Sequence, residues 1–270
     1  MRILVTNDDG IDAPGLHALA AALDDAGCDV IVAAPQEDRS GSGAAIGNLM
    51  PGGQIHAEPR TIDGIEHVPA FGVDGPPALA VMAARLGGFG EPPELVVAGV
   101  NPGNNTGRST LHSGTVGAAL TASNFGVSGL AVSIGWADHP RWNTACRFAV
   151  AAVGWLAGAP VRTVLNLNLP DLDFADVRGV RWAELAAFGT VRAAVVSNDG
   201  GPLQMELHET GLALPPNTDT ALVAAGYAAI TAIVGIRADE WQPVASEVER
   251  RASVLAPRTG RLPVDGAESA

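Results

Sequence analysis

The sequence predicts an α/β fold: a Rossmann-like, doubly wound and mostly parallel sheet with a β-hairpin-rich C-terminal extension. The chain opens with a short apolar run at Arg2–Thr6, a helical pattern over residues 14–26 and a second apolar run over 29–34. Neither run alternates between polar and apolar residues, which is typical of strands that helices cover on both faces. After about residue 180, short apolar runs separated by Gly, Pro and Asn indicate hairpins instead.

Each element follows from its hydrophobic pattern. In the first helix, Leu16, Leu19, Ala20 and Leu23 recur at the spacing of one helix face, and the Gly- and Ala-rich stretch over 41–53 predicts a loop. The later elements are helices over 76–86, 113–123, 144–157 and 240–255, and strands over 94–100, 130–134, 162–169, 191–197, 203–208 and 228–234. We expect a core over 1–180, an extension over 181–255 that serves oligomerisation, and a disordered tail over 256–270.

Composition narrows the function classes. The chain has 270 residues and a net charge of −13, and its basic residues are all Arg. An acidic surface repels nucleic-acid backbone, so we expect no polymeric nucleic-acid partner, and without Lys there is no Schiff-base chemistry. We also expect no membrane segment and no signal peptide, which makes the cytoplasm the expected compartment. Cys28 and Cys146 are predicted to be small buried hydrophobic residues.

Three polar loops leave predicted strands at their carboxyl ends, where doubly wound sheets bind ligands. The first, Asn7-Asp8-Asp9-Gly10, follows the first strand. Neighbouring residues of a strand point to opposite faces, so Asp8 and Asp9 converge only if the chain turns, and Gly10 makes a turn easy. Two converging carboxylates repel each other unless a divalent cation lies between them. An Asx turn that caps the next helix also explains this tetrapeptide.

The second loop contains Arg39-Ser40-Gly41, whose hydroxyl and guanidinium suit a metal or phosphate site; a plain surface loop is the alternative. The third loop runs from Asn101 through Asn105 to Ser113-Gly114-Thr115, which opens a predicted helix. A helix start offers free N–H groups and the positive end of the helix dipole, which together suit a phosphate. An ordinary loop with a Ser or Thr cap is the alternative here.

Taken together, the three loops resemble the SurE-type survival-protein 5′/3′-nucleotidases. The resemblance covers roughly residues 1–235. It rests on residues 6–10, 39–41, 99–107 and 112–119, with weaker similarity at 166–170, 218–219 and 226–227. It implies a metal-dependent phosphomonoesterase that hydrolyses nucleoside 5′- or 3′-monophosphates, assembled as a homodimer or homotetramer. By position, Asp8, Asp9, Ser40 and Asn101 look like metal ligands, and Asn105, Ser113, Gly114 and Thr115 look like the phosphate cradle.

The residue chemistry agrees with that assignment. All four proposed ligands offer oxygen, which suits one Mg²⁺ or Mn²⁺ ion better than Zn²⁺. Asp8 and Asp9 are the expected catalytic residues, and we favour Asp8 for proton transfer to water or the leaving group. No aspartyl-phosphate motif and no cysteine in a phosphate loop is present, so no covalent intermediate is expected.

The sequence departs from the family pattern at several positions, chiefly His112 in place of Tyr, Val73-Asp74-Gly75-Pro76-Pro77, and Thr121. His112 has two interpretations, contact with substrate or an exposed loop residue without a role. Because none of these positions is a proposed metal ligand, two alternatives stay open. One is a phosphatase of the same fold that acts on a non-nucleotide metabolite ester. The other is a non-catalytic nucleotide-binding module.

Overall fold

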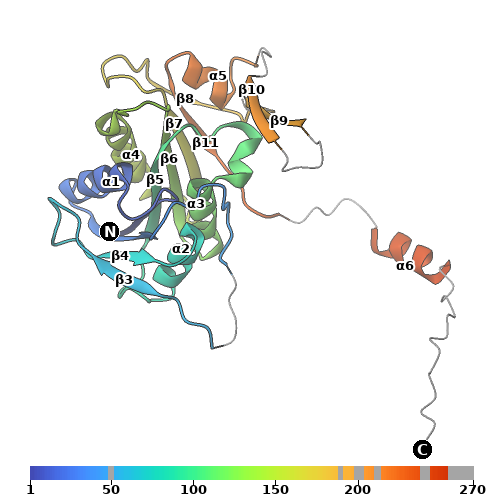
Figure 1. Cartoon of the computed structure of the whole chain (residues 1–270), viewed down its shortest axis with the longest axis horizontal. Helices are drawn as coiled ribbons and strands as arrows, with labels where there is room; N and C mark the ends of the chain where they lie inside the picture. The colour runs from blue at the N-terminus through green and yellow to red at the C-terminus, as the bar shows by residue number, and fades with distance from the viewer. Residues whose placement is uncertain (48–51, 188–190, 198–203, 210–213, 238–243, 255–270) are drawn as a thin grey trace, which may run out of the picture. The chain divides into compact units, whose positions relative to one another are not determined.

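The computed structural model describes residues 1–47, 52–187, 191–197, 204–209, 214–237 and 244–254 (Figure 1). In this part of the chain, nine strands form one mixed sheet in the order β3-β4-β2-β1-β5-β6-β7-β11-β8. The strands of this sheet are β1 (Arg2–Thr6), β2 (Asp29–Pro35), β3 (Ala57–Arg60), β4 (Ala70–Val73), β5 (Leu95–Pro102), β6 (Ser128–Ile134), β7 (Val164–Leu169), β8 (Val180–Trp182) and β11 (Ala228–Ala232). The helices that pack on it are α1 (Pro14–Asp25), α2 (Pro77–Arg85), α3 (Gly114–Asn124) and α4 (Trp142–Leu156).

The direction of chain growth reverses at the centre of the sheet. Strands β4, β2, β1, β5, β6 and β7 are parallel neighbours. From β1 the chain first builds outward through β2 and β4, and then returns to add β5, β6 and β7 on the other side. The reversal falls between β1 and β5. Loops that leave strands at such a point diverge and open a crevice at the carboxyl edge, here between Asn7 and Asn101.

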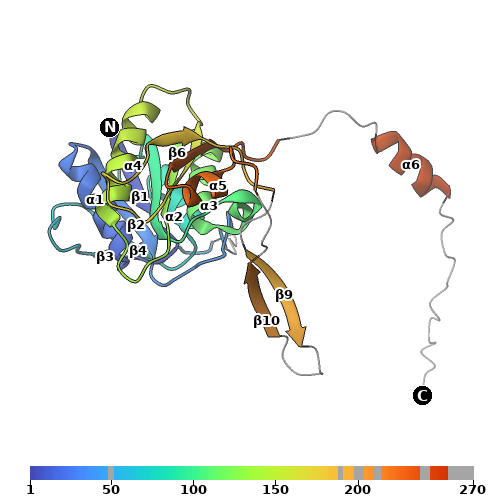
Figure 2. The same ribbon diagram turned by 90° about the horizontal axis from the view of Figure 1, so that it is seen from above.

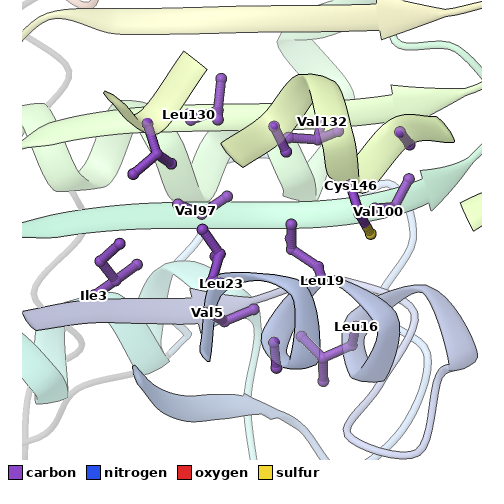
Figure 3. Close-up of a cluster of buried hydrophobic side chains, with 14 of the residues drawn as sticks. Ile3, Val5, Leu16, Leu19, Leu23, Val97, Val100, Leu130, Val132 and Cys146 are labelled. Carbon is purple, nitrogen blue, oxygen red and sulfur yellow. The ribbon is translucent and has the colours of Figure 1, made fainter. Parts of the chain in front are cut away.

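Helices cover both faces of the sheet, as Figures 1 and 2 show from two directions, and an apolar layer lies between the helices and each face. Alternate residues of β1 enter different layers: Ile3 and Val5 pack under α1 and α4, whereas Leu4 packs under α2 and α3. Figure 3 shows part of the first layer, in which Leu19 of α1 and Cys146 of α4 belong to the same buried cluster as Val97 and Val100 of β5. Burial on both faces explains why the central strands read as continuous apolar runs.

Both cysteines are free thiols. Cys146 is buried, and burial raises the pKa of its thiol to about 12, so it behaves as an apolar side chain. Cys28 is half-buried against the same apolar layer.

The two outer strands on the β2 side, β3 and β4, were absent from the sequence prediction. β3 pairs antiparallel with β4 at the edge of the sheet and contains Pro59, which lacks a backbone N–H. An edge strand needs no donor on its free side, so a residue that argues against a central strand is tolerated there.

The chain after residue 180 contributes to the same sheet. β11 pairs antiparallel with β7, and β8 pairs with β11. The predicted hairpin is present as the antiparallel pair β9 (Val191–Ser197) and β10 (Gln204–Glu209), and the short helix α5 (Asp219–Ala224) precedes β11. Residues Met1–Gly235 form one compact unit. The predicted role of 181–255 in oligomerisation stays a prediction.

The second unit, Ile236–Ala270, contains helix α6 (Val244–Val254), whose Glu247 accepts hydrogen bonds from Arg250 and Arg251. Residues 240–243 of the predicted last helix and the predicted tail over 256–270 lie outside the described residues. Within the described ranges, no helix combines the length and apolar character needed to cross a membrane. The predicted fold class, an α/β fold with a mostly parallel sheet and a hairpin-containing C-terminal part, is confirmed.

Candidate active site at the carboxyl edge of the sheet

The loop after β1 turns sharply, as the sequence suggested. Asn7 is fully buried and its side-chain oxygen accepts the N–H of Gly10 at 3.2 Å. Gly10 has φ +111°, a conformation that L side chains rarely adopt, so glycine is required there. This turn directs both Asp8 and Asp9 into a single cavity instead of to opposite faces of the sheet.

That cavity, called the polar cavity below, has a volume of about 280 Å³. It collects residues from all three loops. The predicted site residues that line it are Asp8, Asp9, Ser40, Asn101, Asn105 and Ser113. His112, Ser109, Gly41 and Pro102 complete the lining. The four proposed metal ligands therefore share one cavity, although they lie up to 93 residues apart in the sequence.

Asp8 is held by the start of helix α3. The Thr115 hydroxyl donates to one carboxylate oxygen at 2.6 Å, and the Gly114 N–H donates to the other at 3.0 Å. The Ser113 hydroxyl caps the same helix by accepting the Val116 N–H at 3.1 Å. The positive end of the helix dipole thus meets the Asp8 carboxylate, so Gly114 and Thr115 engage Asp8 in this structure, whereas Ser113 faces the cavity.

Space around Asp8 is limited. A Cβ atom on Gly114 would lie 2.7 Å from the Asp8 Cβ, the Asp8 Oδ2 and the Ser42 Oγ. A Cβ on Gly117, one helical turn further, would lie 2.1 Å from the Gly43 carbonyl oxygen. Real Cβ atoms do not approach so closely, so these two glycines let α3 pack against the loops that carry Asp8 and Ser40.

The neutral oxygen donors are also restrained. Ser40 is exposed, and both its N–H and its hydroxyl donate to the Asp38 carboxylate, at 2.7 and 2.6 Å. The Asn101 side-chain nitrogen donates to the Gly103 carbonyl at 2.6 Å. The Asn101 side-chain oxygen also accepts the Thr115 hydroxyl at 3.3 Å, so one lone pair of this oxygen and those of the Ser40 hydroxyl remain for a ligand.

Asn105 is fixed by the neighbouring strands β6 and β7. Its N–H donates to Asn168 at 2.8 Å, and its carbonyl accepts the side chains of Asn166 and Asn168 at 2.8 and 3.0 Å. Its side chain bonds to the Ser133 hydroxyl at 2.9 Å. Because a hydroxyl can donate or accept, this bond survives either orientation of the Asn105 amide, including the one that turns its NH₂ group toward an anion.

Burial raises the pKa values of both carboxyl groups. For Asp8, desolvation is the largest cause, and the hydrogen bonds from Thr115 and Gly114 oppose it in part. For Asp9, desolvation and then the negative charges of Asp8 and Asp38 raise the pKa to about 7. The Asp9 Oδ2 atom is buried and has no hydrogen-bond partner. The site therefore holds two carboxyl groups whose negative charge is poorly compensated by the protein.

A divalent cation fits this arrangement. The donor set consists of carboxylate, hydroxyl and amide oxygens, which suits Mg²⁺ or Mn²⁺. Within the described residues, the buried Asp9 Oδ2 has no hydrogen-bond donor and no Arg or Lys lines the polar cavity, so a cation would stabilise this oxygen. Within the described residues, no group of three or more His, Cys, Asp or Glu side chains suits a metal ion, so any cation here must also use neutral oxygens.

Comparison with known proteins identifies the family. Residues 3–190 match the family model described as survival protein SurE. The chain belongs to the SurE family. Curated relatives include the 5′-nucleotidase SurE of Xanthomonas campestris pv. campestris (strain 8004), 36% identical over 242 residues that cover 86% of this chain and 89% of the relative. The 5′-nucleotidase SurE of Stenotrophomonas maltophilia (strain K279a) is 34% identical over the same shares of both chains.

A solved SurE structure supports the same family assignment. The SurE protein from Aquifex aeolicus superimposes with a TM-score of 0.72 and 26% sequence identity, over 93% of this chain and all of that one. The predicted SurE resemblance is confirmed, and the predicted enzyme class, a phosphoric monoester hydrolase, agrees with the names of the curated SurE relatives.

Sequence reasoning missed one buried carboxylate that shapes the SurE site. Asp219, at the start of α5, is fully buried and accepts the N–H groups of Gly107 at 2.7 Å and Ala186 at 3.0 Å. Gly107 begins the 3₁₀ helix η1 (Gly107–His112), which carries Ser109 and His112 to the polar cavity. The resemblance at Thr218-Asp219 was the signal, but nothing in the sequence relates it to a loop 112 residues away.

Proposed function

We propose that this chain is a metal-dependent phosphomonoesterase that hydrolyses nucleoside 5′- or 3′-monophosphates to nucleoside and phosphate. The observation that carries the proposal is the content of the polar cavity. Two carboxylates, hydroxyls and amides line it, and no Arg or Lys among the described residues lines it to offset a phosphate dianion. A phosphate ester next to Asp8 and Asp9 becomes favourable only with a cation between them, which is the requirement of a metal-dependent phosphatase.

Asp8, Asp9, Ser40 and Asn101 would hold one Mg²⁺ or Mn²⁺ ion. Such an ion, when bound, supplies positive charge that polarises the phosphoryl oxygens. Thr115 and Gly114 orient Asp8 through its two oxygens. The sequence favoured Asp8 for proton transfer to water or the leaving group, but both Asp8 oxygens accept hydrogen bonds, so we propose Asp9 for that role instead.

Asn105 and Ser113 would bind the phosphate oxygens. Both line the polar cavity, and Asn105 is anchored to β7 by its backbone, so its side chain is pre-positioned. Ser109 and His112 line the same cavity and extend the set of possible phosphate donors. Fixed donors stabilise the charge that redistributes over the phosphoryl oxygens without reorganising during the reaction.

The test is phosphate release from a panel of nucleoside 5′- and 3′-monophosphates and sugar phosphates, with Mn²⁺, with Mg²⁺ and with chelator. We expect metal-dependent release that is fastest from a nucleotide. Asp9→Asn should lower kcat by roughly 100-fold or more, because it removes a charged ligand from the cation. Asp138→Asn, an exposed loop residue outside the cavity, is the matched control.

Three outcomes would contradict the proposal. Phosphate release that persists in chelator would show that the reaction needs no metal. Full activity of Asp9→Asn would show that Asp9 is not a site residue. Weak turnover of every nucleotide beside fast turnover of another ester would show that the substrate is not a nucleotide. A homodimeric or homotetrameric assembly and a cytoplasmic location remain predictions from the sequence.

A further inference from the structure

A second cavity adjoins the polar cavity and has no role in the proposed chemistry. It has a volume of about 380 Å³ and shares Asp9 and Pro102 with the polar cavity. The two cavities flank the end of β5. Asn101 lines the polar cavity, whereas Val100, which packs in the layer under α1 and α4 (Figure 3), lines the second cavity. A group bonded to a phosphate in the polar cavity therefore reaches the second cavity by crossing Asp9 or Pro102.

One aromatic side chain lines this second cavity. Trp142, the first residue of α4, lines it and is partly buried. A Cβ atom on Gly15 would lie 3.0 Å from the Trp142 ring and 2.2 Å from the Val100 carbonyl oxygen, so only glycine lets the start of α1 approach the indole. The segment Ala13-Pro14-Gly15, which does not line the polar cavity, lines the second cavity as well.

Hydrogen bonds of the preceding residue, Arg141, fix the position of Trp142. The Arg141 N–H donates to Asp171 at 2.7 Å, and its guanidinium donates to Asp171 and Asp173, both at 2.8 Å. These bonds tie the start of α4 to the loop after β7. The indole therefore borders a cavity whose walls are ordered on both sides.

The charge and hydrogen-bonding capacity of the lining residues indicate which chemical group the second cavity would bind. The polar side chains in the lining, apart from the shared Asp9, are Asp12 and Gln36, and no Arg or His lines this cavity. Asp12 is exposed and Gln36 is half-buried, and neither side chain forms a hydrogen bond with another described residue. Such a wall disfavours a second phosphate or a carboxylate. It suits a neutral group that combines an aromatic plane with hydroxyl groups.

We propose that this cavity is the nucleoside subsite, in which Trp142 stacks on the base while Asp12 and Gln36 accept or donate hydrogen bonds to the sugar hydroxyls or the base edge. The inference rests on the proposed function, since it places the leaving group of the phosphate ester. It adds that the enzyme selects neutral nucleoside leaving groups over charged ones and over those without a ring.

The first test compares two esters. Trp142→Ala should lower kcat/KM for adenosine 5′-monophosphate by about tenfold, mainly through KM, because stacking on an aromatic side chain is lost. Turnover of glycerol phosphate, whose leaving group has no ring, should change by less than about twofold. Trp142→Phe, which keeps a ring, should restore most of the nucleotide activity. Trp155→Ala, on an exposed tryptophan of the same helix outside both cavities, should leave both esters unchanged.

An equal loss on both esters, or no loss on either, would overturn the subsite. Trp142 also packs against the apolar layer under α1 and α4, so the alanine variant loses stability. If it does not fold, Gln36→Ala serves in its place, with an expected loss of about threefold for the nucleotide alone.

The second test does not depend on catalysis. Adenosine binding to the intact chain is measured by calorimetry with and without Mn²⁺, and Trp142→Ala should weaken it about tenfold while Trp155→Ala does not. This result supports the subsite even if no ester is hydrolysed, in which case the proposed function alone fails. Hydrolysis of nucleotides without any binding of adenosine, or with equal binding to Trp142→Ala, rejects the subsite and leaves the proposed function intact.

Discussion

The two cavities at the end of β5 differ in how the protein builds them. Side chains of the polar cavity are locked by short hydrogen bonds, such as Thr115 to Asp8 at 2.6 Å, and by glycines that leave no room for a methyl group. The second cavity is lined by Trp142, two prolines, and Asp12 and Gln36, whose side chains form no hydrogen bond within the described part of the chain. A cation and a phosphoryl group demand oxygens at fixed places, whereas a nucleoside needs mainly a surface of the right shape and charge.

The comparison predicts that small volume changes damage the polar cavity most. Gly114→Ala should lower kcat by roughly 100-fold, since a Cβ 2.7 Å from Asp8 and Ser42 must displace the carboxylate. Adenosine binding in the second cavity should stay within about twofold of the intact chain, because Gly114 does not line that cavity. Steady-state kinetics and calorimetry on the same preparation measure both quantities.

Gly154→Ala provides the matched control for that substitution. Gly154 lies within α4, and nothing lies within 4 Å of the Cβ that it would gain. We expect unchanged kinetics and a rise in unfolding free energy of up to about 1 kcal/mol, because alanine is the better helix former. Normal activity in Gly114→Ala would mean that the Asp8 carboxylate is not as confined as the distances indicate.

The hydrogen bond on Asp8 gives the next largest effect. Thr115→Val keeps the volume but removes the hydroxyl that donates to Asp8, and we expect kcat to fall by about 10- to 100-fold. Thr115→Ser should recover most of the rate, since it restores the donor. Thr121→Val removes a hydroxyl that donates to the Gly117 carbonyl in the same helix, so it should leave kcat unchanged. Equal rates for the Val and Ser variants at position 115 would remove Thr115 from any role in orienting Asp8.

Asp219 connects a distant segment to the polar cavity only. The two Asp219 oxygens accept the N–H groups of Gly107 and Ala186. Asp219→Asn replaces one of these oxygens by an NH₂ group, so one of the two N–H groups loses its acceptor. We expect a loss of about 1–3 kcal/mol in unfolding free energy, measured by denaturant titration. Because Gly107 begins the segment that carries Ser109 and His112, kcat should fall several-fold, whereas adenosine affinity should not change. A parallel loss of adenosine affinity would show that the two cavities are not built independently.

The last prediction concerns pH and the metal-free protein. The pKa of Asp9 is about 7 in the folded chain against an ordinary value of 3.8, so between these values the folded state binds a proton that the unfolded state lacks. Stability contributed by protonated Asp9 is therefore full below about pH 4 and is lost as the pH rises toward 7. In chelator, the unfolding free energy of Asp9→Asn relative to the intact chain should rise over this interval and then level off. A flat difference across that range would mean that Asp9 is ionised without penalty.

Local sequence patterns predicted much of the fold for a physical reason. Burial on both faces leaves continuous apolar runs, so β1, β2, β5, β6 and β7 are visible without tertiary information. β3 was missed because it lies at the edge, exposes most of its residues and contains Pro59. β8 and α5 were missed because runs of 3 and 6 residues are too short to show periodicity.

The sequence by itself determined which residue types leave the carboxyl ends of the strands: paired aspartates, a serine and an asparagine, followed by a Ser-Gly-Thr helix start. Only the tertiary structure decided that Gly114 and Thr115 hold Asp8, that Asp219 anchors a loop 112 residues earlier, and that Trp142 borders a neighbouring cavity. Hydrophobic period and turn chemistry are properties of neighbouring residues, whereas these contacts depend on the path of the chain between distant segments. That path is set by the reversal between β1 and β5, which no local pattern records.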